Sequence, residues 1–192
     1  MVNDPVALFR QWYAQACRAG VPLRDAVALA TADASGRPSV RYVLLKDADR
    51  RGFVFYTHAA SRKGRELAAN PRAALAFYWH KTGRQVRVEG RVVRVPGAEA
   101  DAYWATRPRL SQLGAHASHQ SRPYAGKYEL VKAVARLTLA FRGRTIPRPP
   151  GWAGYRIVPR AVEFWTRGAF RLHERLLFTR SARGWKRTLL QP

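Results

Sequence analysis

One short segment combines three side chains that can carry positive charge: Arg171-Leu172-His173-Glu174-Arg175. If it is a strand, alternate side chains share a face, so Arg171, His173 and Arg175 project together. Three cations on a buried face are unfavourable unless an anion lies against them. The alternative is an exposed basic edge strand, which discourages aggregation. Apolar residues on both sides of the segment are expected of a strand rooted in a core and favour the anion site.

Two other segments place cations beside predicted elements. Ser61-Arg62-Lys63 begins a predicted helix after Tyr56-Thr57, and a helix N-terminus with a hydroxyl group and two cations can hold a phosphate. Arg41 and Lys46 stand at the two ends of an apolar strand. Ideal alternation puts these two cations on opposite faces, which leaves open whether they serve two ligands or two subunits.

Several familiar catalytic motifs are missing from the sequence. It has no GxSxG elbow, HExxH motif, P-loop or GxGxxG loop. His116 and His119 have a spacing that suits a metal on a helix, but no carboxylate or cysteine lies close by in the sequence, so no metal site is predicted. Cys17 is the one cysteine, which excludes an intrachain disulfide framework; we interpret it as a small apolar residue buried on a helix.

The hydrophobic pattern predicts many short strands with a few helices between them. Strands are expected at 26–32, 40–45, 52–57, 72–79, 85–95, 154–157, 161–165, 170–178 and 185–190. Helices are expected from an Asp4 cap to a Gly20 stop, and at 61–69, 98–106, 110–116 and 127–141. This order predicts a single domain over residues 1–192, mainly β with peripheral helices (α+β), built as a closed or nearly closed antiparallel barrel.

Composition narrows the class of protein. The chain has 192 residues, 47% of them hydrophobic, which is enough for one buried core. Its 35 Lys+Arg against 12 Asp+Glu give a net charge of +23, which attracts polyanions. The basic residues are spread along the chain without a nucleic-acid-binding motif, so we expect a solvated basic surface with a few phosphate sites instead. No apolar run approaches the ~20 residues of a membrane span and no secretory signal is visible, so the expected compartment is the cytoplasm.

Several motifs occur in an order that resembles the pyridoxamine 5′-phosphate oxidase family. They run through nearly the whole chain, from about residue 4 to residue 192, and together are far more specific than any one alone. They are Arg41-Tyr42-Val43-Leu44-Leu45-Lys46, Phe55-Tyr56-Thr57, Ser61-Arg62-Lys63, Arg84-Gln85-Val86, Ser111-Gln112-Leu113-Gly114-Ala115, Gln120-Ser121, Glu163-Phe164-Trp165 and Arg171-Leu172-His173-Glu174-Arg175. The resemblance implies an FMN-binding split β-barrel, assembled as a homodimer with two FMN sites at the subunit interface.

The resemblance also assigns roles to individual residues. FMN would be held by Arg41, Lys46, Tyr56, Thr57, Arg62, Lys63, Gln85, Gln120, Ser121, Trp165 and Arg175. The substrate phosphate would be bound by Lys46, Tyr103, Arg107 and Ser111. The catalytic pair Arg171 and His173 would line the reacting end of the substrate. Spacing supports one part of this set, because Tyr103 and Arg107 are four residues apart on a predicted helix and therefore neighbours.

The reaction that the resemblance implies is the oxidation of pyridoxine or pyridoxamine 5′-phosphate to pyridoxal 5′-phosphate. Hydride would pass to FMN, and dioxygen would be the final acceptor, giving hydrogen peroxide. A related FMN oxidase of the phenazine-biosynthesis type, acting on a bulkier substrate, is the first alternative. A non-catalytic flavin- or nucleic-acid-binding module is the second. The residues expected to bind a substrate phosphate favour the first interpretation.

Three departures from the family pattern bear on the substrate. Family members usually carry an N-terminal extension over the substrate, whereas three residues precede Asp4 here. His116 follows Gly114-Ala115 where the family often has tryptophan, and Leu189 replaces an arginine near the C-terminus. We therefore expect differences in substrate closure. Arg187 lies two residues before Leu189, on the same face of a predicted strand, and could supply the displaced charge.

Overall fold

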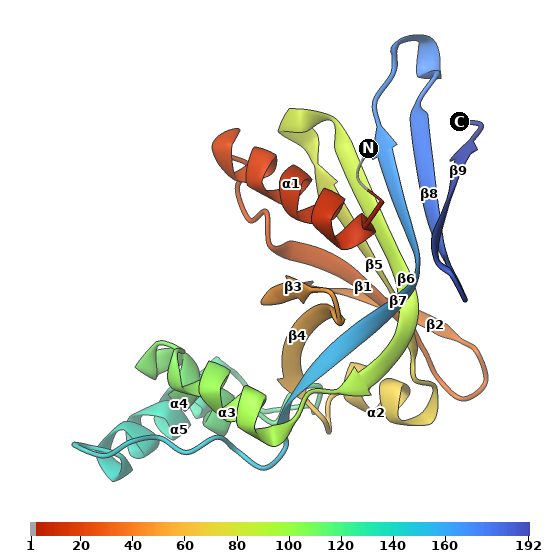
Figure 1. The fold of residues 1–192 in the computed structure, drawn as a ribbon. Coiled ribbons are helices and arrows are strands. Elements are labelled where there is room, and N and C mark those ends of the chain that lie inside the picture. Colours follow the sequence, from red (N-terminus) through yellow and green to blue (C-terminus); the bar gives the residue numbers. More distant parts are fainter. Residues whose placement is uncertain (1–2) are drawn as a thin grey trace. The chain divides into compact units, whose positions relative to one another are not determined.

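The computed structural model describes residues 3–192 and is mainly β. Its strands form a nine-stranded sheet in the order β2-β1-β5-β6-β7-β4-β3, to which β8 is added beside β7 and β9 beside β8 (Figure 1). Each pairing with a described register is antiparallel. The strands are β1 (Ala26–Ala32), β2 (Pro38–Leu44), β3 (Asp47–Asp49), β4 (Gly52–His58), β5 (Arg72–Trp79), β6 (Arg84–Arg94), β7 (Trp152–Thr166), β8 (Glu174–Ser181) and β9 (Gly184–Leu190).

The helices follow the signals read from the sequence. They are α1 (Pro5–Arg18), α2 (Arg62–Ala69), α3 (Gly97–Ala105), α4 (Arg109–Ala117) and α5 (Lys127–Ala140), with short 3-10 helices η1 (His80–Thr82) and η2 (Ala169–Arg171). Asp4 caps α1 because its carboxylate accepts a hydrogen bond from the Val6 N–H at 2.9 Å. Gly20, just past the end of α1, has a φ of 61°, which glycine adopts without strain.

Contacts between residues divide the chain into two compact units. The first comprises residues 3–55, 66–93 and 156–192, and the second comprises residues 56–65 and 94–155. Strands β4, β6 and β7 and helix α2 each contribute residues to both units. A single domain over residues 1–192 stays a prediction.

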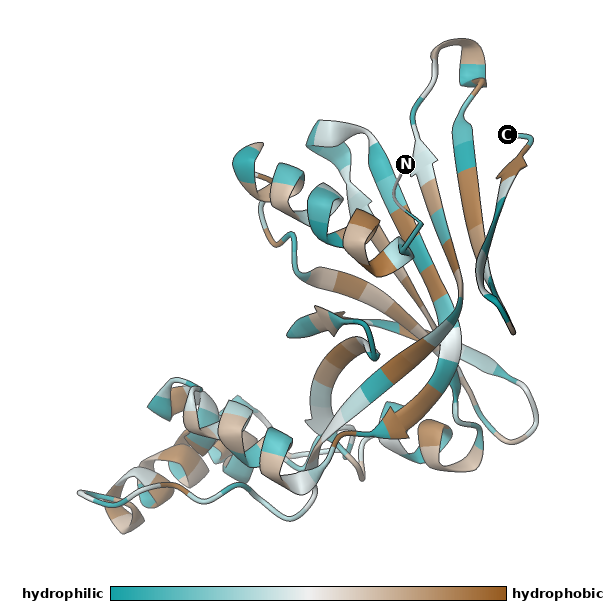
Figure 2. Cartoon of the chain, viewed as in Figure 1, coloured by the Kyte–Doolittle hydropathy of each residue, from teal (hydrophilic) through white to brown (hydrophobic). Residues whose placement is uncertain are grey.

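The core of the first unit lies between α1 and the inner face of the sheet. Phe9 of α1 is 1% exposed and packs against Phe53 and Phe77, with ring centroids 4.9 Å and 5.0 Å apart. Figure 1 shows α1 lying along β5 and β6, and Figure 2 shows hydrophobic and hydrophilic residues alternating along these strands. This alternation buries one face of the sheet and exposes the other.

The core of the second unit is built from aromatic residues of its helices and of β7. Trp104, Leu113, Ile146 and Trp152 are buried together. The indole N–H of Trp104 donates to the Ile146 carbonyl at 2.7 Å, so the polar atom of this buried ring has a partner. The helices α3, α4 and α5 are thereby fixed around one aromatic cluster.

The predicted strands and helices agree with the structure to within a residue or two, with two exceptions. The first is that the strands expected at 154–157 and 161–165 form one strand, β7. Pro159 lies between the two predicted strands, and a proline has no N–H to donate within a sheet, so a break in the strand was expected there. At this point β6 approaches β7 closely, and Gly90 makes room for it: a Cβ on Gly90 would come within 2.1 Å of the Val158 carbonyl oxygen.

The second exception is the segment 170–178, expected to be a single strand. Phe170 and Arg171 have φ values of 52° and 65°, in the left-handed region, and β8 begins only at Glu174. Arg171 therefore belongs to a tight turn before the strand. The prediction that Arg171, His173 and Arg175 share one face of a strand was wrong, because it relied on strand periodicity in a turn.

Candidate anion-binding site

In the second unit, the residues around the start of α2 converge on a buried ammonium group. Lys63 is 8% exposed, and its Nζ lies 3.3 Å from both the Thr57 hydroxyl and the Gln120 side-chain oxygen. Thr57 in turn donates to the Gln120 oxygen at 2.8 Å. An ammonium group in such a cluster of oxygens is a donor that an anion could also contact.

A hydroxyl group and a backbone N–H complete this arrangement. The N–H of Arg62, at the first position of α2, donates to the Ser121 hydroxyl at 3.1 Å. Ser121 has a φ of 71°, so the loop after α4 is held in a conformation unusual for serine. The structure thus brings together Thr57, Arg62, Lys63, Gln120 and Ser121, all of them expected from the sequence to bind FMN.

A second feature of this unit is an arginine surrounded by aromatic rings. The rings of Tyr56 and Tyr103 stack at 4.3 Å, and those of Tyr56 and Trp152 at 4.8 Å. The guanidinium carbon of Arg107 lies 5.0 Å from the ring centres of both Trp104 and Trp152. Tyr103 and Arg107 therefore both lie at one aromatic wall, but α3 ends at Ala105, so the prediction that the two share a helix was wrong.

One donor of this arginine is not satisfied. Among the described residues, the buried NH1 of Arg107 has no hydrogen-bond partner. Burial lowers the pKa of Arg107, although an arginine stays protonated at neutral pH. A buried, charged donor without a partner is unfavourable and fits a site for an anionic ligand. Ser111, exposed in the first turn of α4, follows Arg107 by four residues.

In the first unit, Arg41 lies in a network that the sequence analysis did not foresee. Its NH1 donates to the Thr31 hydroxyl, and its NH2 donates to Ser39 and, at 3.1 Å, to Glu66. Thr31 and Ser39 are direct cross-strand partners in β1 and β2, and Glu66 lies in α2. The sequence offered one signal for this network: Thr31 and Ser39 are polar residues in two strands that are otherwise mostly apolar.

Trp165 on β7 and Arg175 on β8 are direct cross-strand partners, and the side chain of each contacts a further residue. Arg175 donates to Glu163 at 2.8 Å, and this hydrogen bond raises the pKa of the guanidinium. The rings of Trp165 and His173 lie 4.5 Å apart. The Gly168 N–H donates to Nδ1 of His173 at 3.2 Å, so a neutral ring carries its proton on Nε2.

The remaining predicted residues have separate surroundings. Lys46 forms an ion pair with Asp25 at 3.5 Å, and Gln85 lies on β6 opposite Tyr78. Leu189 is 79% exposed on β9. Arg187, two positions earlier on β9, places its guanidinium carbon 5.7 Å from the ring centre of Phe178. The expectation that both lie on one strand is confirmed.

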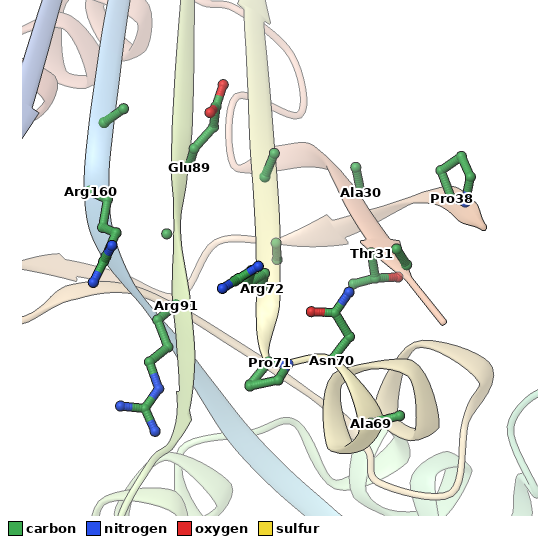
Figure 3. A pocket seen from close by; sticks show the side chains of 15 residues that line it. Ala30, Thr31, Pro38, Ala69, Asn70, Pro71, Arg72, Glu89, Arg91 and Arg160 are labelled. Carbon is green, nitrogen blue, oxygen red and sulfur yellow. The ribbon is translucent and has the colours of Figure 1, made fainter. Parts of the chain in front are cut away.

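A hollow of about 700 Å³ lies on the first unit, at the ends of β1, β5 and β6 (Figure 3). Arg72, Arg91 and Arg160 line it from three different strands, and none of them has an ion-pair partner among the described residues. Arg72 and Arg91 are direct cross-strand partners, an arrangement that repels. Glu89 lies nearby but is paired with Arg87 at 2.6 Å.

In residues 3–192, no three His, Cys, Asp or Glu side chains are grouped so that they could hold a metal ion. His116 instead places a ring nitrogen 2.7 Å from the Pro147 carbonyl and packs near Trp104. None of the described helices has the length and apolar character needed to cross a membrane.

Two parts of the chain match known protein families. Residues 13–140 match the family described as pyridoxamine 5′-phosphate oxidase, and residues 152–192 match the pyridoxine 5′-phosphate oxidase C-terminal dimerisation region. The chain belongs to the pyridoxamine 5′-phosphate oxidase family. The resemblance drawn from the motifs is confirmed, and so is the expectation of an oxidoreductase.

Individual relatives of this family member cover almost its whole length. It is 54% identical to the pyridoxine/pyridoxamine 5′-phosphate oxidase of Rubrobacter xylanophilus, over 98% of this chain and 87% of that protein. It is 53% identical to the protein of the same name from Nitrobacter winogradskyi, over 99% of this chain and 90% of that protein.

Two solved structures have a similar fold. One is PhzG from Burkholderia lata in complex with tetrahydrophenazine-1-carboxylic acid, with a TM-score of 0.95 and 39% identity over 100% of this chain and 94% of that one. The other is a pyridoxamine 5′-phosphate oxidase-related FMN binding protein from Nostoc punctiforme, with a TM-score of 0.78 and 17% identity over 96% of this chain and 97% of that one. The predicted antiparallel split-barrel fold, mainly β with peripheral helices, is confirmed.

Proposed function

We propose that this protein is an FMN-dependent oxidase that converts pyridoxine or pyridoxamine 5′-phosphate to pyridoxal 5′-phosphate. Dioxygen is the electron acceptor and hydrogen peroxide is the second product. The observation that carries the proposal is Arg107, whose buried NH1 has no partner among the described residues although it lies beside an aromatic wall. A phosphorylated aromatic ring supplies an anion for Arg107 and a flat surface that can pack against this wall.

FMN is the cofactor in this proposal. When bound, it accepts the hydride and returns the electrons to dioxygen. In the second unit, Thr57, Arg62, Lys63, Gln120 and Ser121 would hold it together with Tyr56, and the described hydrogen bonds support this set. In the first unit, Arg41, Lys46, Gln85, Trp165 and Arg175 complete the set. Their donors suit a phosphate and the polar edge of a flavin ring.

In this proposal one group of residues binds the substrate phosphate and another lines the reacting end of the substrate. Arg107, Tyr103, Ser111 and Lys46 bind the phosphate. Arg171 and His173 line the reacting end, and oxidation of an alcohol there also releases a proton. His173 takes that proton through Nδ1, which must first give up its hydrogen bond from the Gly168 N–H. Tyr56, Tyr103 and Trp152 exclude water through their stacked rings.

The active form in this proposal is a homodimer. Val40, Tyr42 and Leu44 alternate along β2 and are 69%, 77% and 45% exposed, opposite small alanines of β1. An apolar patch of this kind on a sheet edge fits a second copy of the chain. The match of residues 152–192 to a dimerisation region gives independent support.

A related oxidase that acts on a bulkier substrate is the second candidate. Its support is the similarity to PhzG, whose structure holds a tetrahydrophenazine carboxylic acid. The two candidates differ in the substrate that reduces the flavin. The protein, purified with FMN, is mixed anaerobically with pyridoxine 5′-phosphate, with pyridoxamine 5′-phosphate or with a reduced phenazine carboxylic acid. Loss of the yellow flavin absorbance with either vitamin phosphate supports the proposal; bleaching by the phenazine compound alone contradicts it.

A further inference from the structure

Glu66 of α2 carries a carboxylate that is buried in the first unit. Glu66 is 6% exposed, and both of its oxygens accept from the Ser39 hydroxyl, at 2.8 Å and 2.7 Å. One of them also accepts from Thr31 and from Arg41. A buried carboxylate is unfavourable unless it is paired and hydrogen-bonded, and here both conditions hold.

The network fixes the guanidinium of Arg41 from one side. Thr31, Ser39 and Glu66 accept from its NH1 and NH2, whereas its Nε–H has no partner among the described residues. An arginine side chain is otherwise flexible, and ordering it opposes ligand binding. An arginine held in this way presents its remaining donors in a fixed direction, which suits a phosphate.

We propose that Glu66 is a positioning residue that orients Arg41 for the phosphate group of the flavin cofactor. This inference rests on the proposed function, in which Arg41 binds FMN. Glu66 does not touch the phosphate and acts through Arg41. If Glu66 acted only through its charge, it would repel the phosphate, and removing it would strengthen FMN binding. If Glu66 orients Arg41, removing it should weaken FMN binding.

The test compares two flavins that differ in the phosphate group. Flavin-depleted protein is titrated with FMN and with riboflavin, and binding is followed by quenching of flavin fluorescence. Glu66→Gln keeps the size of the side chain and removes its charge. FMN affinity should fall roughly tenfold, as expected for the loss of a charge-assisted contact, while riboflavin affinity stays the same. Asp101→Asn, which removes an exposed carboxylate from an ion pair with Arg148, is the matched control and should change neither affinity.

Two further variants separate positioning from a general structural role. In an Arg41→Ala background, Glu66→Gln should have no additional effect on FMN, because it acts through the missing guanidinium. Ser39→Ala removes the hydroxyl group that both oxygens of Glu66 contact, and should give a smaller loss of the same FMN-specific kind. This second variant serves as the test if Glu66→Gln does not fold.

The possible results lead to different conclusions. An FMN-specific loss that disappears without Arg41 supports the inference. Unchanged or tighter FMN binding in Glu66→Gln overturns it, and so does an equal loss for FMN and riboflavin, which would mean that Glu66 only maintains the fold. In these last cases the wild-type protein still binds FMN and the proposed function stands. A wild-type protein that binds no FMN overturns the proposed function, and this inference with it.

Discussion

The Nζ of Lys63 lies 3.3 Å from the side-chain oxygen of Gln120, although 57 residues separate the two in the chain. The lysine stands in the first turn of α2 and the glutamine in the loop after α4. This contact joins two motifs that the sequence could only place in order. It also holds the buried Lys63 side chain beside the oxygen atoms of Thr57 and Gln120, in a cluster that a phosphate could join.

Lys63 gives the first prediction, which concerns cofactor binding. Lys63→Met keeps the length of the side chain and removes its charge, so FMN should bind about 10- to 100-fold more weakly. The measurement is flavin retained per chain after gel filtration, together with a fluorescence titration. Lys132→Met, which changes a lysine placed over the exposed Tyr128 ring, is the control. Equal FMN affinity in the wild type and Lys63→Met would remove Lys63 from the site.

The second prediction concerns the substrate phosphate. Arg107→Ala should lower kcat/KM for pyridoxine 5′-phosphate by about 10- to 150-fold, the equivalent of roughly 1.5–3 kcal/mol. The reason is loss of charge-assisted hydrogen bonds from a buried donor that has no other described partner. Steady-state peroxide release measures the effect. Unphosphorylated pyridoxine should be turned over poorly by the wild type and no worse by the variant. If the wild type handles both compounds equally well, a phosphate-binding Arg107 is wrong.

Assembly provides a third prediction. Tyr42→Glu places a charge in the exposed apolar row of β2 and should convert the dimer to a monomer, because an unpaired charge is expensive to bury. Light scattering over a range of protein concentrations reports the change. Tyr124→Glu alters another exposed tyrosine, in the second unit, and should leave the dimer intact. A Tyr42→Glu protein with the wild-type mass would show that this face of β2 is not the interface.

The fourth prediction is a pH dependence of stability around Asp49. Burial by itself would raise the pKa of Asp49, but hydrogen bonds from Arg51 and the charge of Arg156 outweigh it and lower the pKa. A carboxyl group whose pKa is lowered on folding stabilises the protein above its ordinary pKa of about 3.9 and loses that effect as the pH falls through the lower value. Asp49→Asn should therefore reduce the free energy of unfolding by about 1.5–3 kcal/mol near neutral pH.

The same variant should lose this difference in acid. Once the pH has fallen below the lowered pKa of Asp49, its carboxyl group and the amide that replaces it are both neutral, so urea unfolding should give nearly equal stabilities for the two proteins. Asp47→Asn, an exposed change on the same short strand, should have little effect at any pH. A deficit for Asp49→Asn that persists unchanged in acid would mean that the pairing with Arg51 and Arg156 is not its cause.

A fifth prediction tests the repulsion between Arg72 and Arg91. Arg72→Glu turns a directly opposed like-charge pair into an attractive one and should raise the free energy of unfolding by about 0.2–1 kcal/mol. Arg72→Gln should give part of that gain. Chemical unfolding at fixed protein concentration measures both, and high salt should reduce the gain. A destabilised Arg72→Glu would indicate that the three arginines of the hollow are needed together.

The sequence by itself determined most of the elements and the family. Strand alternation, the Asp4 cap and the Gly20 stop depend on neighbouring residues, so a local reading of the chain finds them. The motifs identified the family because many of them occur along the chain in the same order as in the family. Recognising that order requires no knowledge of which residues touch. Local reading failed at Phe170 and Arg171, where left-handed backbone replaces a strand that the flanking apolar residues favoured.

Only the tertiary structure decided which side chains meet. The cross-strand register of β1 and β2 sets Thr31 opposite Ser39, and the packing of α2 then brings Glu66 to Arg41. The unsatisfied donor of Arg107 likewise exists because Trp104 and Trp152 bury it, and those two residues lie 48 positions apart. Burial and hydrogen-bond partnership are properties of contacts between distant segments, and no periodicity along the chain encodes them.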